Sequence, residues 1–344
     1  MKRTTLKDIA DRLGLSQNTI SVALRGNPGI NAETRELILR TAQEMGYTPK
    51  SRSGADRKNI LLISKAATAS DPYFFNHLFG VIQNEINSLG YTLLTMNTDD
   101  LKNSFNTQIE FNQYLDQSKI AGFLILGDID EASCKLLCSQ EIPIVGASFY
   151  LPGVPMSCVV EDNISGSYML VEYLVSRGYK KLGFIGNLDN ISFWERFSAF
   201  KGSMIRFGLS NSGTYDLLGI DSNNTDSMDQ LTKMIAEMDS LPEAFVCCND
   251  HMAAVTLKVL YNQGLRCPED IAVVGFDNNE ICRLSTPTIT SIDTSRNLQG
   301  VISVRLLDQR ITGKQKQDQR LVLPVRLQEG LSVAEHCSCN TLHI

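Results

Sequence analysis

The chain of 344 residues is long enough for two or three domains, and its composition, 43% hydrophobic and 20% charged, is typical of a globular protein. No apolar run approaches the roughly 20 residues that span a bilayer, and the N-terminal segment lacks the apolar stretch of a secretory signal. The nine cysteines are scattered, without the paired spacing of a zinc site. We therefore expect a cytoplasmic protein with reduced thiols, no membrane contact, no metal and no cofactor.

The formal charge of −6 is unevenly distributed. Residues 1–58 hold eleven Lys or Arg and six Asp or Glu, which is +5, whereas residues 59–344 hold 21 and 32, which is −11. A basic N-terminal segment on an acidic body is typical of a small nucleic-acid-binding module fused to another domain. Charge alone leaves open an uneven surface without functional meaning.

Three short helices are predicted within the first fifty residues from caps and apolar periodicity. Their expected N-caps are Thr5, Ser16 and Asn31, and a glycine follows each helix. Thr5 and Asp8 also have the spacing of a capping box. A bundle of this size, over residues 1–49, is too small for an independent enzyme and has the size of a helix-turn-helix unit.

The second of these helices is predicted to read DNA, because its apolar side would face the bundle and leave a polar side free. Gln17 and Asn18 have paired donor and acceptor groups that match adenine in the major groove, and Val22 can contact a thymine methyl. Hydroxyls and a guanidinium beside them are placed for phosphates. The predicted DNA interface comprises Thr5, Leu6, Ser16, Gln17, Asn18, Thr19, Ser21, Val22, Arg25 and Asn31.

From Ile60 onward, apolar runs of four to six residues alternate with longer amphipathic stretches. This alternation predicts βαβ units and parallel sheets, and two sheets are favoured because one core rarely exceeds about 250–300 residues. The predicted fold is therefore a small all-α helix-turn-helix domain followed by an α/β core of two doubly wound parallel-sheet subdomains. The expected strands are 60–64, 91–96, 122–126, 142–146, 182–185, 244–248 and 271–276, and the expected helices include 74–89, 165–177, 197–207 and 251–263.

Doubly wound sheets bind ligands beyond the carboxyl ends of their strands, so polar residues that follow the apolar runs are candidates for a ligand site. Asn249 and Asp277 each follow a strand, and Trp194 and Arg196 lie beyond a third. Carboxylates, a guanidinium and aromatic rings are suited to the hydroxyls of a sugar-like ligand. Each of these residues, taken alone, could equally be a helix cap or part of a solvated loop.

Two groups of motifs resemble the LacI/GalR family of repressors. They are the headpiece segments 5–26, 31–38 and 46–49, and the core segments 162–166, 178–186, 248–253, 264–277 and 287–292. The resemblance implies a periplasmic-binding-protein-like core with three crossovers, near residues 161, 291 and 320. The expected domains are 1–49 (DNA binding), 50–59 (linker), 60–336 (effector-binding core) and a tail, 337–344. Within the core, the expected N-subdomain is about 60–161 and 292–320, and the C-subdomain about 162–291 and 321–336.

The resemblance also implies roles for particular residues. Gln17, Asn18 and Val22 match base-reading positions of the family. By position, Arg196, Asn249 and Asp277 match family residues that contact the effector, and Pro72 and Phe75 match its apolar wall; Trp194 completes the predicted effector-binding set. In the family the linker often folds as a hinge helix with a leucine in the minor groove. Here no leucine stands between residues 49 and 60 and Gly54 interrupts the stretch, which leaves that contact open.

These features predict a repressor whose affinity for a pseudo-palindromic operator is controlled by a small, sugar-type effector between the two subdomains, in a homodimer. An enzyme fused to a helix-turn-helix would need a phosphate-binding glycine loop, and the sequence contains neither a Walker motif nor G-x-G-x-x-G. The four histidines suggest no catalytic arrangement either. A second alternative keeps the DNA-binding role but replaces the small effector with a protein co-regulator, and the sequence leaves it open.

Overall fold

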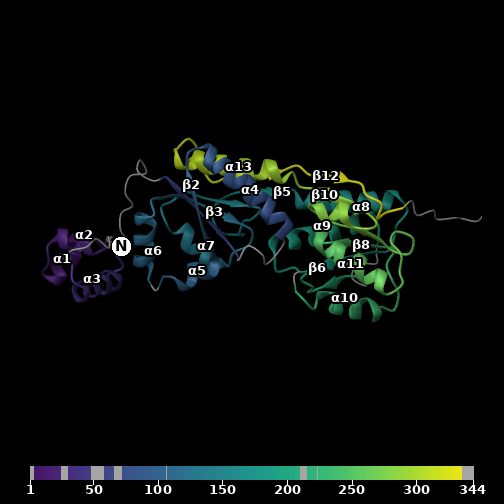
Figure 1. Cartoon of the computed structure of the whole chain (residues 1–344), viewed down its shortest axis with the longest axis horizontal. Coiled ribbons are helices and arrows are strands. Elements are labelled where there is room, and N and C mark those ends of the chain that lie inside the picture. Colours follow the sequence, from purple (N-terminus) through teal and green to yellow (C-terminus); the bar gives the residue numbers. More distant parts are fainter. Residues whose placement is uncertain are drawn as a thin grey trace, which may run out of the picture.

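The computed structural model describes residues 4–24, 30–47, 58–65, 72–105, 107–209, 215–222 and 224–334. They form a helical headpiece, an N-terminal lobe and a C-terminal lobe, arranged in a row (Figure 1). The predictions for Arg25, for most of the linker and for the tail at 337–344 lie outside the described residues. No helix in the described ranges is long and apolar enough to cross a membrane.

The headpiece consists of α1 (Leu6–Leu13), α2 (Gln17–Leu24) and α3 (Ala32–Glu44). The predicted caps are confirmed. Thr5 and Asp8 form a capping box, Ser16 Oγ accepts a bond from the Thr19 amide at 3.0 Å, and Asn31 caps α3. Each cap satisfies an amide that the first helical turn leaves without a partner, which is why these short helices begin where they do.

The N-terminal lobe is a parallel sheet of six strands in the order β11-β5-β4-β3-β1-β2. Its strands are β1 (Asn59–Ser64), β2 (Thr92–Asn97), β3 (Ile120–Leu126), β4 (Ile144–Ala147), β5 (Ser157–Glu161) and β11 (Arg320–Leu323). One face packs on α4 (Pro72–Ser88) and α13 (Arg296–Ile311), and the other on α5 (Thr98–Asn103), α6 (Gln108–Gln117) and α7 (Glu131–Cys138). Both faces are therefore apolar, which explains the continuous apolar runs in the sequence.

The C-terminal lobe contains a parallel sheet of four strands in the order β7-β6-β8-β9. The strands are β6 (Leu182–Gly186), β7 (Leu217–Leu218), β8 (Ala244–Cys247) and β9 (Ala272–Val274). Its helices are α8 (Asn163–Ser176), α9 (Ile191–Arg206), α10 (Ser227–Ala236), α11 (Asp250–Asn262) and α12 (Glu280–Leu284). An antiparallel pair, β10 (Ser291–Asp293) with β12 (Arg326–Gln328), completes this lobe. Two parallel α/β lobes behind a helical headpiece are the predicted fold class.

The chain passes between the lobes three times, after β5, after β10 and after β11. The third passage lies beyond Leu323, a few residues later than expected, because β11 pairs with β5 in the N-terminal lobe. Strands β5, β7, β10, β11 and β12 were not predicted. They have two to five residues each, and none of them contains an apolar run of four or more residues, which was the signal used for the others.

The headpiece contacts the N-terminal lobe through α6, which lies beside it in Figure 1. Ile109, only 3% exposed, packs into the same apolar cluster as Ile9, Ile20 and Ile38 of the headpiece. Gln113 donates a hydrogen bond from Nε2 to the carbonyl oxygen of Leu24 at 2.7 Å. The last turn of α2 is thus tied to the core by both an apolar and a polar contact.

Candidate functional site

The polar side of α2 is open at its N-terminal end. Gln17 and Asn18 are exposed, whereas Ser21 and Val22 are half-buried on the next turn. The opposite side of the helix is buried, as predicted. Amide groups at the exposed start of a second helix have the position from which such helices contact base edges.

The other predicted DNA contacts surround that helix. Thr5, Ser16 and Asn31 are exposed cap residues at the starts of the three helices, and Leu6 and Thr19 are half-buried. Helix N-termini carry partial positive charge and open amides, so they are suited to phosphate oxygens. The described headpiece therefore places the predicted DNA contacts at the exposed start of α2 and at the helix N-termini.

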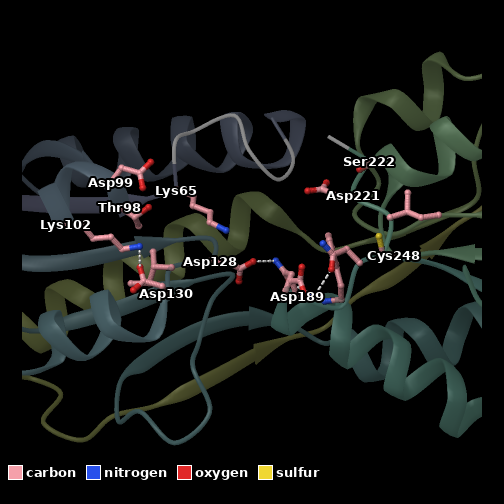
Figure 2. A pocket seen from close by; sticks show the side chains of 15 residues that line it. Lys65, Thr98, Asp99, Lys102, Asp128, Asp130, Asp189, Asp221, Ser222 and Cys248 are labelled. Atoms are coloured by element: carbon pink, nitrogen blue, oxygen red, sulfur yellow. Dashed lines mark hydrogen bonds and ion pairs between the residues drawn. The ribbon is translucent and has the colours of Figure 1, made fainter. Parts of the chain in front are cut away.

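A cavity of about 520 Å³ lies between the two lobes, within the range of about 300–1,000 Å³ that is usual for small-molecule sites. Figure 2 shows side chains from both lobes around it. From the N-terminal lobe come Lys65, Thr98, Asp99, Lys102, Asp128, Ile129 and Asp130, and from the C-terminal lobe Asn187, Asp189, Asn190, Phe193, Ile220, Asp221, Ser222 and Cys248. Most of these residues stand within four residues of the end of a strand, so the cavity lies at the carboxyl ends of both sheets.

Asp128 connects the two walls of this cavity. Its carboxylate accepts a hydrogen bond from Asn190 Nδ2 of the C-terminal lobe (Figure 2). Burial raises the pKa of Asp128 to about 6, and the negative charge of Glu161 adds to this, although Lys65 and the Asn190 bond oppose it. The carboxylate of Asp128 therefore lies between the lobes where its charge is poorly solvated.

On the N-terminal wall, Lys102 Nζ lies 3.0 Å from Asp130 Oδ2. Burial alone would raise the pKa of Asp130, but the bonds from Ser133 and the charge of Lys102 lower it to about 2. This aspartate is therefore ionised at neutral pH, and its charge is already matched by a lysine.

Behind the cavity, Arg196 is 3% exposed and joins the lobes. Nε donates to Asn163 Oδ1 at 2.8 Å, and the terminal nitrogens donate to the Cys248 carbonyl at 2.7 Å, to Glu161 at 3.2 Å and to both oxygens of Asp277 at 3.0 and 3.3 Å. A guanidinium has five N–H donors, and these five bonds use all of them. In this conformation Arg196 could reach a ligand only by exchanging one of these bonds.

Glu161 and Glu195 extend the network across the lobes. Glu161, at the end of β5, also accepts hydrogen bonds from Gln299 at 3.0 Å and Ser148 at 3.1 Å. Glu195, on α9, accepts bonds from Arg320 of β11 at 2.9 Å and from Tyr150 at 2.5 Å. Two buried carboxylates, one from each lobe, are thus each bonded to an arginine of the other lobe.

Asp277 has an unusual backbone as well as a buried charge. Its φ of 102° lies in a region that side-chain-bearing residues rarely adopt. The bidentate bond to Arg196 holds it there, and the Phe276 ring packs against the same guanidinium, 3.8 Å from the Arg196 Cζ atom to the ring centroid. Strained residues of this kind are typical of ligand clamps and switch regions.

Phe75, Asn249 and Trp194 were also predicted to bind the effector; each is next to a cavity residue or its neighbour, but none of them lines the cavity. Phe75 packs over Gly127, directly before Asp128; its ring leaves no space for a side chain on Gly127, and the φ of 71° at this residue also favours glycine. Asn249 is buried and caps α11 by accepting a bond from the Met252 amide at 2.8 Å. Trp194 is 52% exposed on α9. Pro72 begins α4, and its side chain is outside the described part of the chain.

The structure thus brings Arg196 and Asp277 together, but none of the predicted effector residues whose side chains are described is among those that line the cavity. Lys65, Thr98, Asp128 and Asn187 each stand one or two residues beyond the end of a strand. The rule that ligands bind at carboxyl ends pointed to these positions. The sequence held no further signal to choose among them.

Comparison with known proteins agrees with this architecture. Residues 5–50 match the family described as "Bacterial regulatory proteins, lacI family", and residues 171–333 match the "Periplasmic binding protein-like domain". The chain is 28% identical over 323 residues to the "HTH-type transcriptional repressor PurR" of Pasteurella multocida (strain Pm70), covering 93% of this chain and 95% of that one. The protein of the same name from Histophilus somni (strain 129Pt) is 25% identical over 317 residues, with 91% and 94% covered.

Solved structures show the same fold. A lac repressor dimer bound to operator and the anti-inducer ONPF superposes with a TM-score of 0.70 at 21% identity, covering 97% of this chain and 100% of that one. A complex of the transcriptional regulator CelR with cellobiose has a TM-score of 0.69 at 24% identity, with 96% and 100% covered. Both likenesses extend over the headpiece and the two lobes.

The match over residues 5–50 includes the open helix α2, and the solved structures share both lobes between which the cavity lies. The family consists of transcription regulators rather than enzymes. The chain belongs to the lacI family of bacterial regulatory proteins: it is a DNA-binding transcription regulator with a periplasmic-binding-protein-like, effector-binding core.

Proposed function

We propose that this regulator is a cytoplasmic, homodimeric repressor of a pseudo-palindromic operator, and that a small polyhydroxylated effector of the sugar type, bound between the lobes, controls its affinity for DNA. The single observation that carries the proposal is the cavity of about 520 Å³ with polar groups from both lobes. Carboxylate and amide side chains are the groups that bond ligand hydroxyls, and a site shared by two lobes couples occupancy to the angle between them.

The comparisons support this class of effector. One solved relative holds cellobiose, and a LacI family regulator from Enterococcus faecium with a TM-score of 0.67 and 21% identity holds ribose, with 81% of this chain and 99% of that one covered. The relatives named PurR are called repressors. In the proposed site, side chains such as Asp128 and Asn190 bond the effector, Phe75 supports the wall, and Arg196 with Glu161 joins the lobes behind it.

The proposed mechanism follows from the chain's geometry. In a dimer, the angle between lobes sets the separation of the two headpieces, which must match two operator half-sites about one helical turn apart. Ile109 and Gln113 of α6 contact the headpiece, so a movement of the N-terminal lobe is transmitted to the headpiece through α6. By linkage, an effector that changes operator affinity by some factor must itself bind operator-bound protein with affinity changed by the same factor.

A ligand screen tests the proposal. Thermal unfolding of the purified protein is measured against free sugars, sugar phosphates, small glycosides and nucleobases, and each hit is then tested for its effect on operator affinity. A ligand at one hundred times its Kd stabilises the folded state by about 2.7 kcal/mol, which is readily measured. Trp194 is the only tryptophan in the chain and lies on α9 beside the cavity residue Phe193, so its emission reports binding independently.

Either result is informative. A single chemical class of hits that also changes operator affinity supports the proposal, whereas hits that stabilise the protein without affecting DNA binding contradict the regulatory part. If no compound in the panel stabilises the protein, control by a protein co-regulator is favoured, and affinity capture from the source cell is the next experiment.

A further inference from the structure

A buried carboxylate, Glu195, joins the two lobes at a second place. Glu195 lies on α9 of the C-terminal lobe and is 7% exposed. Its Oε1 atom accepts hydrogen bonds from Arg320 Nη2 at 2.9 Å and from the Tyr150 hydroxyl at 2.5 Å, and both donors belong to the N-terminal lobe. The Arg320 guanidinium also packs on the Tyr150 ring, with its Cζ atom 3.9 Å from the ring centroid. Each of the three side chains therefore contacts the other two.

The other oxygen of Glu195 faces the buried network. Oε2 accepts a hydrogen bond from Asn163 Nδ2 at 2.8 Å, and Asn163 Oδ1 accepts one from Arg196 Nε at 2.8 Å. Because a side-chain amide donates only through its nitrogen and accepts only through its oxygen, these two bonds fix the orientation of Asn163. Glu195 thus determines which group Asn163 presents to Arg196.

Two arginine–carboxylate bridges consequently cross between the lobes in opposite directions. Arg196 of the C-terminal lobe bonds Glu161 at 3.2 Å, and both side chains are almost fully buried. Arg320 of the N-terminal lobe bonds Glu195 at 2.9 Å, and the Arg320 side chain is 45% exposed. Breaking a buried pair leaves an uncompensated charge, whereas water solvates an exposed cation that leaves its partner. A movement of the lobes therefore breaks the Arg320 bridge more easily than the Arg196 bridge.

We infer that Glu195 is a positioning residue of the effector site, and that its bonds to Arg320 and Tyr150 hold the two lobes at their present angle. This inference rests on the proposed function, since it names residues that regulate the site between the lobes. When the Arg320 and Tyr150 bonds break, Glu195 no longer fixes Asn163, and Arg196 becomes free to exchange a bond with a ligand. The same carboxylate thus controls the angle between the lobes and the access of a ligand to Arg196.

The C-terminal lobe contains a second cluster of the same composition that does not cross between lobes. Glu329 Oε2 accepts hydrogen bonds from Arg177 Nη2 at 2.7 Å and from the Tyr173 hydroxyl at 2.9 Å. The Arg177 Cζ atom lies 4.1 Å from the centroid of the Tyr173 ring. Both donors belong to the region of α8, and Glu329 directly follows β12, so all three groups are in one lobe. Glu329→Gln is therefore the matched control for Glu195→Gln.

The distance between the lobes tests the inference without any ligand. Glutamine at position 195 keeps the size of the side chain but has one acceptor oxygen, so it cannot satisfy Arg320 and Asn163 together. Pulsed electron resonance measures the distance between spin labels on unnatural amino acids at two exposed positions, Asn103 in the N-terminal lobe and Asp239 in the C-terminal lobe. Labelled full-length protein is diluted into excess unlabelled protein, so that only distances within one chain are recorded. We expect Glu195→Gln to show a second population at a different distance, and Glu329→Gln to match the wild type.

Operator binding tests the regulatory consequence. An operator is first selected by the wild-type protein from random-sequence DNA, and its Kd is measured for each variant by fluorescence anisotropy. In Glu195→Gln this Kd changes by about fivefold or more, which is the lower end of usual allosteric couplings, and in Glu329→Gln it stays at the wild-type value. Arg320→Gln removes the partly exposed partner alone and changes the Kd in the same direction.

The outcomes separate this inference from the proposed function. An unchanged distance in both Glu195→Gln and Arg320→Gln overturns the inference and leaves the proposed effector site in place. A changed distance with an unchanged operator Kd overturns its regulatory part. Equal changes in Glu329→Gln also overturn it, because they show a general loss of stability. If instead the distance and the operator Kd change as expected but no compound in the ligand screen binds, the small-molecule effector is overturned and the role of Glu195 in setting the lobe angle is supported.

Discussion

Replacing Glu161 by glutamine tests whether the buried network behind the cavity holds the two lobes together. The Glu161 carboxylate is 2% exposed and accepts three hydrogen bonds, from Arg196 at 3.2 Å, Gln299 at 3.0 Å and Ser148 at 3.1 Å. Glutamine keeps the size but offers one oxygen and an NH₂ donor to these three donors. At least one of them is then left without an acceptor.

The expected cost follows from those bonds. Breaking a buried ion pair from one side typically costs about 3–5 kcal/mol, and a hydrogen bond to a charged group contributes about 1.5–3 kcal/mol. Asp277 still compensates Arg196 through bonds of 3.0 and 3.3 Å, so the guanidinium is not left as an isolated charge. We therefore expect Glu161→Gln to lower the free energy of unfolding by about 3 kcal/mol.

Urea unfolding followed by tryptophan emission measures this cost. Trp194 is the single tryptophan and stands two residues before Arg196, so its signal reports the region of the network. The matched control is Glu329→Gln, which removes the partner of Arg177 in a pair with a distance of 2.7 Å whose side chains are 26% and 60% exposed. Exposed pairs contribute about 0–1 kcal/mol, so the control should stay within that range. A Glu161→Gln cost no larger than that of Glu329→Gln would refute the reasoning.

Three further predictions address the headpiece, its contact with the core, and a buried carboxyl. Asn18→Ala should weaken specific operator binding by about 1–3 kcal/mol and non-specific DNA binding far less, because the exposed amide is predicted to read a base edge; fluorescence anisotropy on operator and scrambled DNA measures both. Ile109→Ala should lower the stability of the headpiece by about 2 kcal/mol, at the low end for a core isoleucine because α6 lies at its margin, as measured by calorimetry. The melting temperature of Asp250→Asn should exceed that of the wild type, and the difference should be larger at pH 9 than at pH 6. Burial, and then the charge of Asp277, raise the pKa of Asp250 to about 8, so the wild type loses the associated stability as pH rises from about 4 through 8.

Each of these predictions has a distinct contradiction. Equal losses on operator and scrambled DNA would make Asn18 a backbone contact. If the melting transition of the headpiece is the same in Ile109→Ala, in the surface control Gln117→Ala and in the wild type, then α6 does not stabilise the headpiece. For Asp250→Asn, a melting difference that is independent of pH would show that the carboxyl does not titrate in this range. The asparagine can accept from the Asn279 amide and donate to Ser291, so the variant retains the local bonds.

Much of the local structure was readable from the sequence. The caps at Thr5, Ser16 and Asn31 act on amides within the next three residues, so the local sequence alone locates the starts of the headpiece helices. The alternation of apolar runs with amphipathic stretches predicted parallel sheets because a strand buried on both faces must be apolar throughout. The carboxyl-end rule also predicted the edge of the sheets at which the cavity is found.

The tertiary structure alone determined which side chains that are distant in the sequence contact each other. Glu161 and Arg196 are 35 positions apart and meet only because the first crossover places the end of β5 against α9. A sequence shows that Arg196 can form five hydrogen bonds, but the folded chain shows that protein acceptors take all of them. Local propensity depends on neighbouring residues and can be read along the chain. The pairing of charges, the two-residue strand β7 and the acidic character of the cavity depend on packing between segments, which no short stretch of sequence contains.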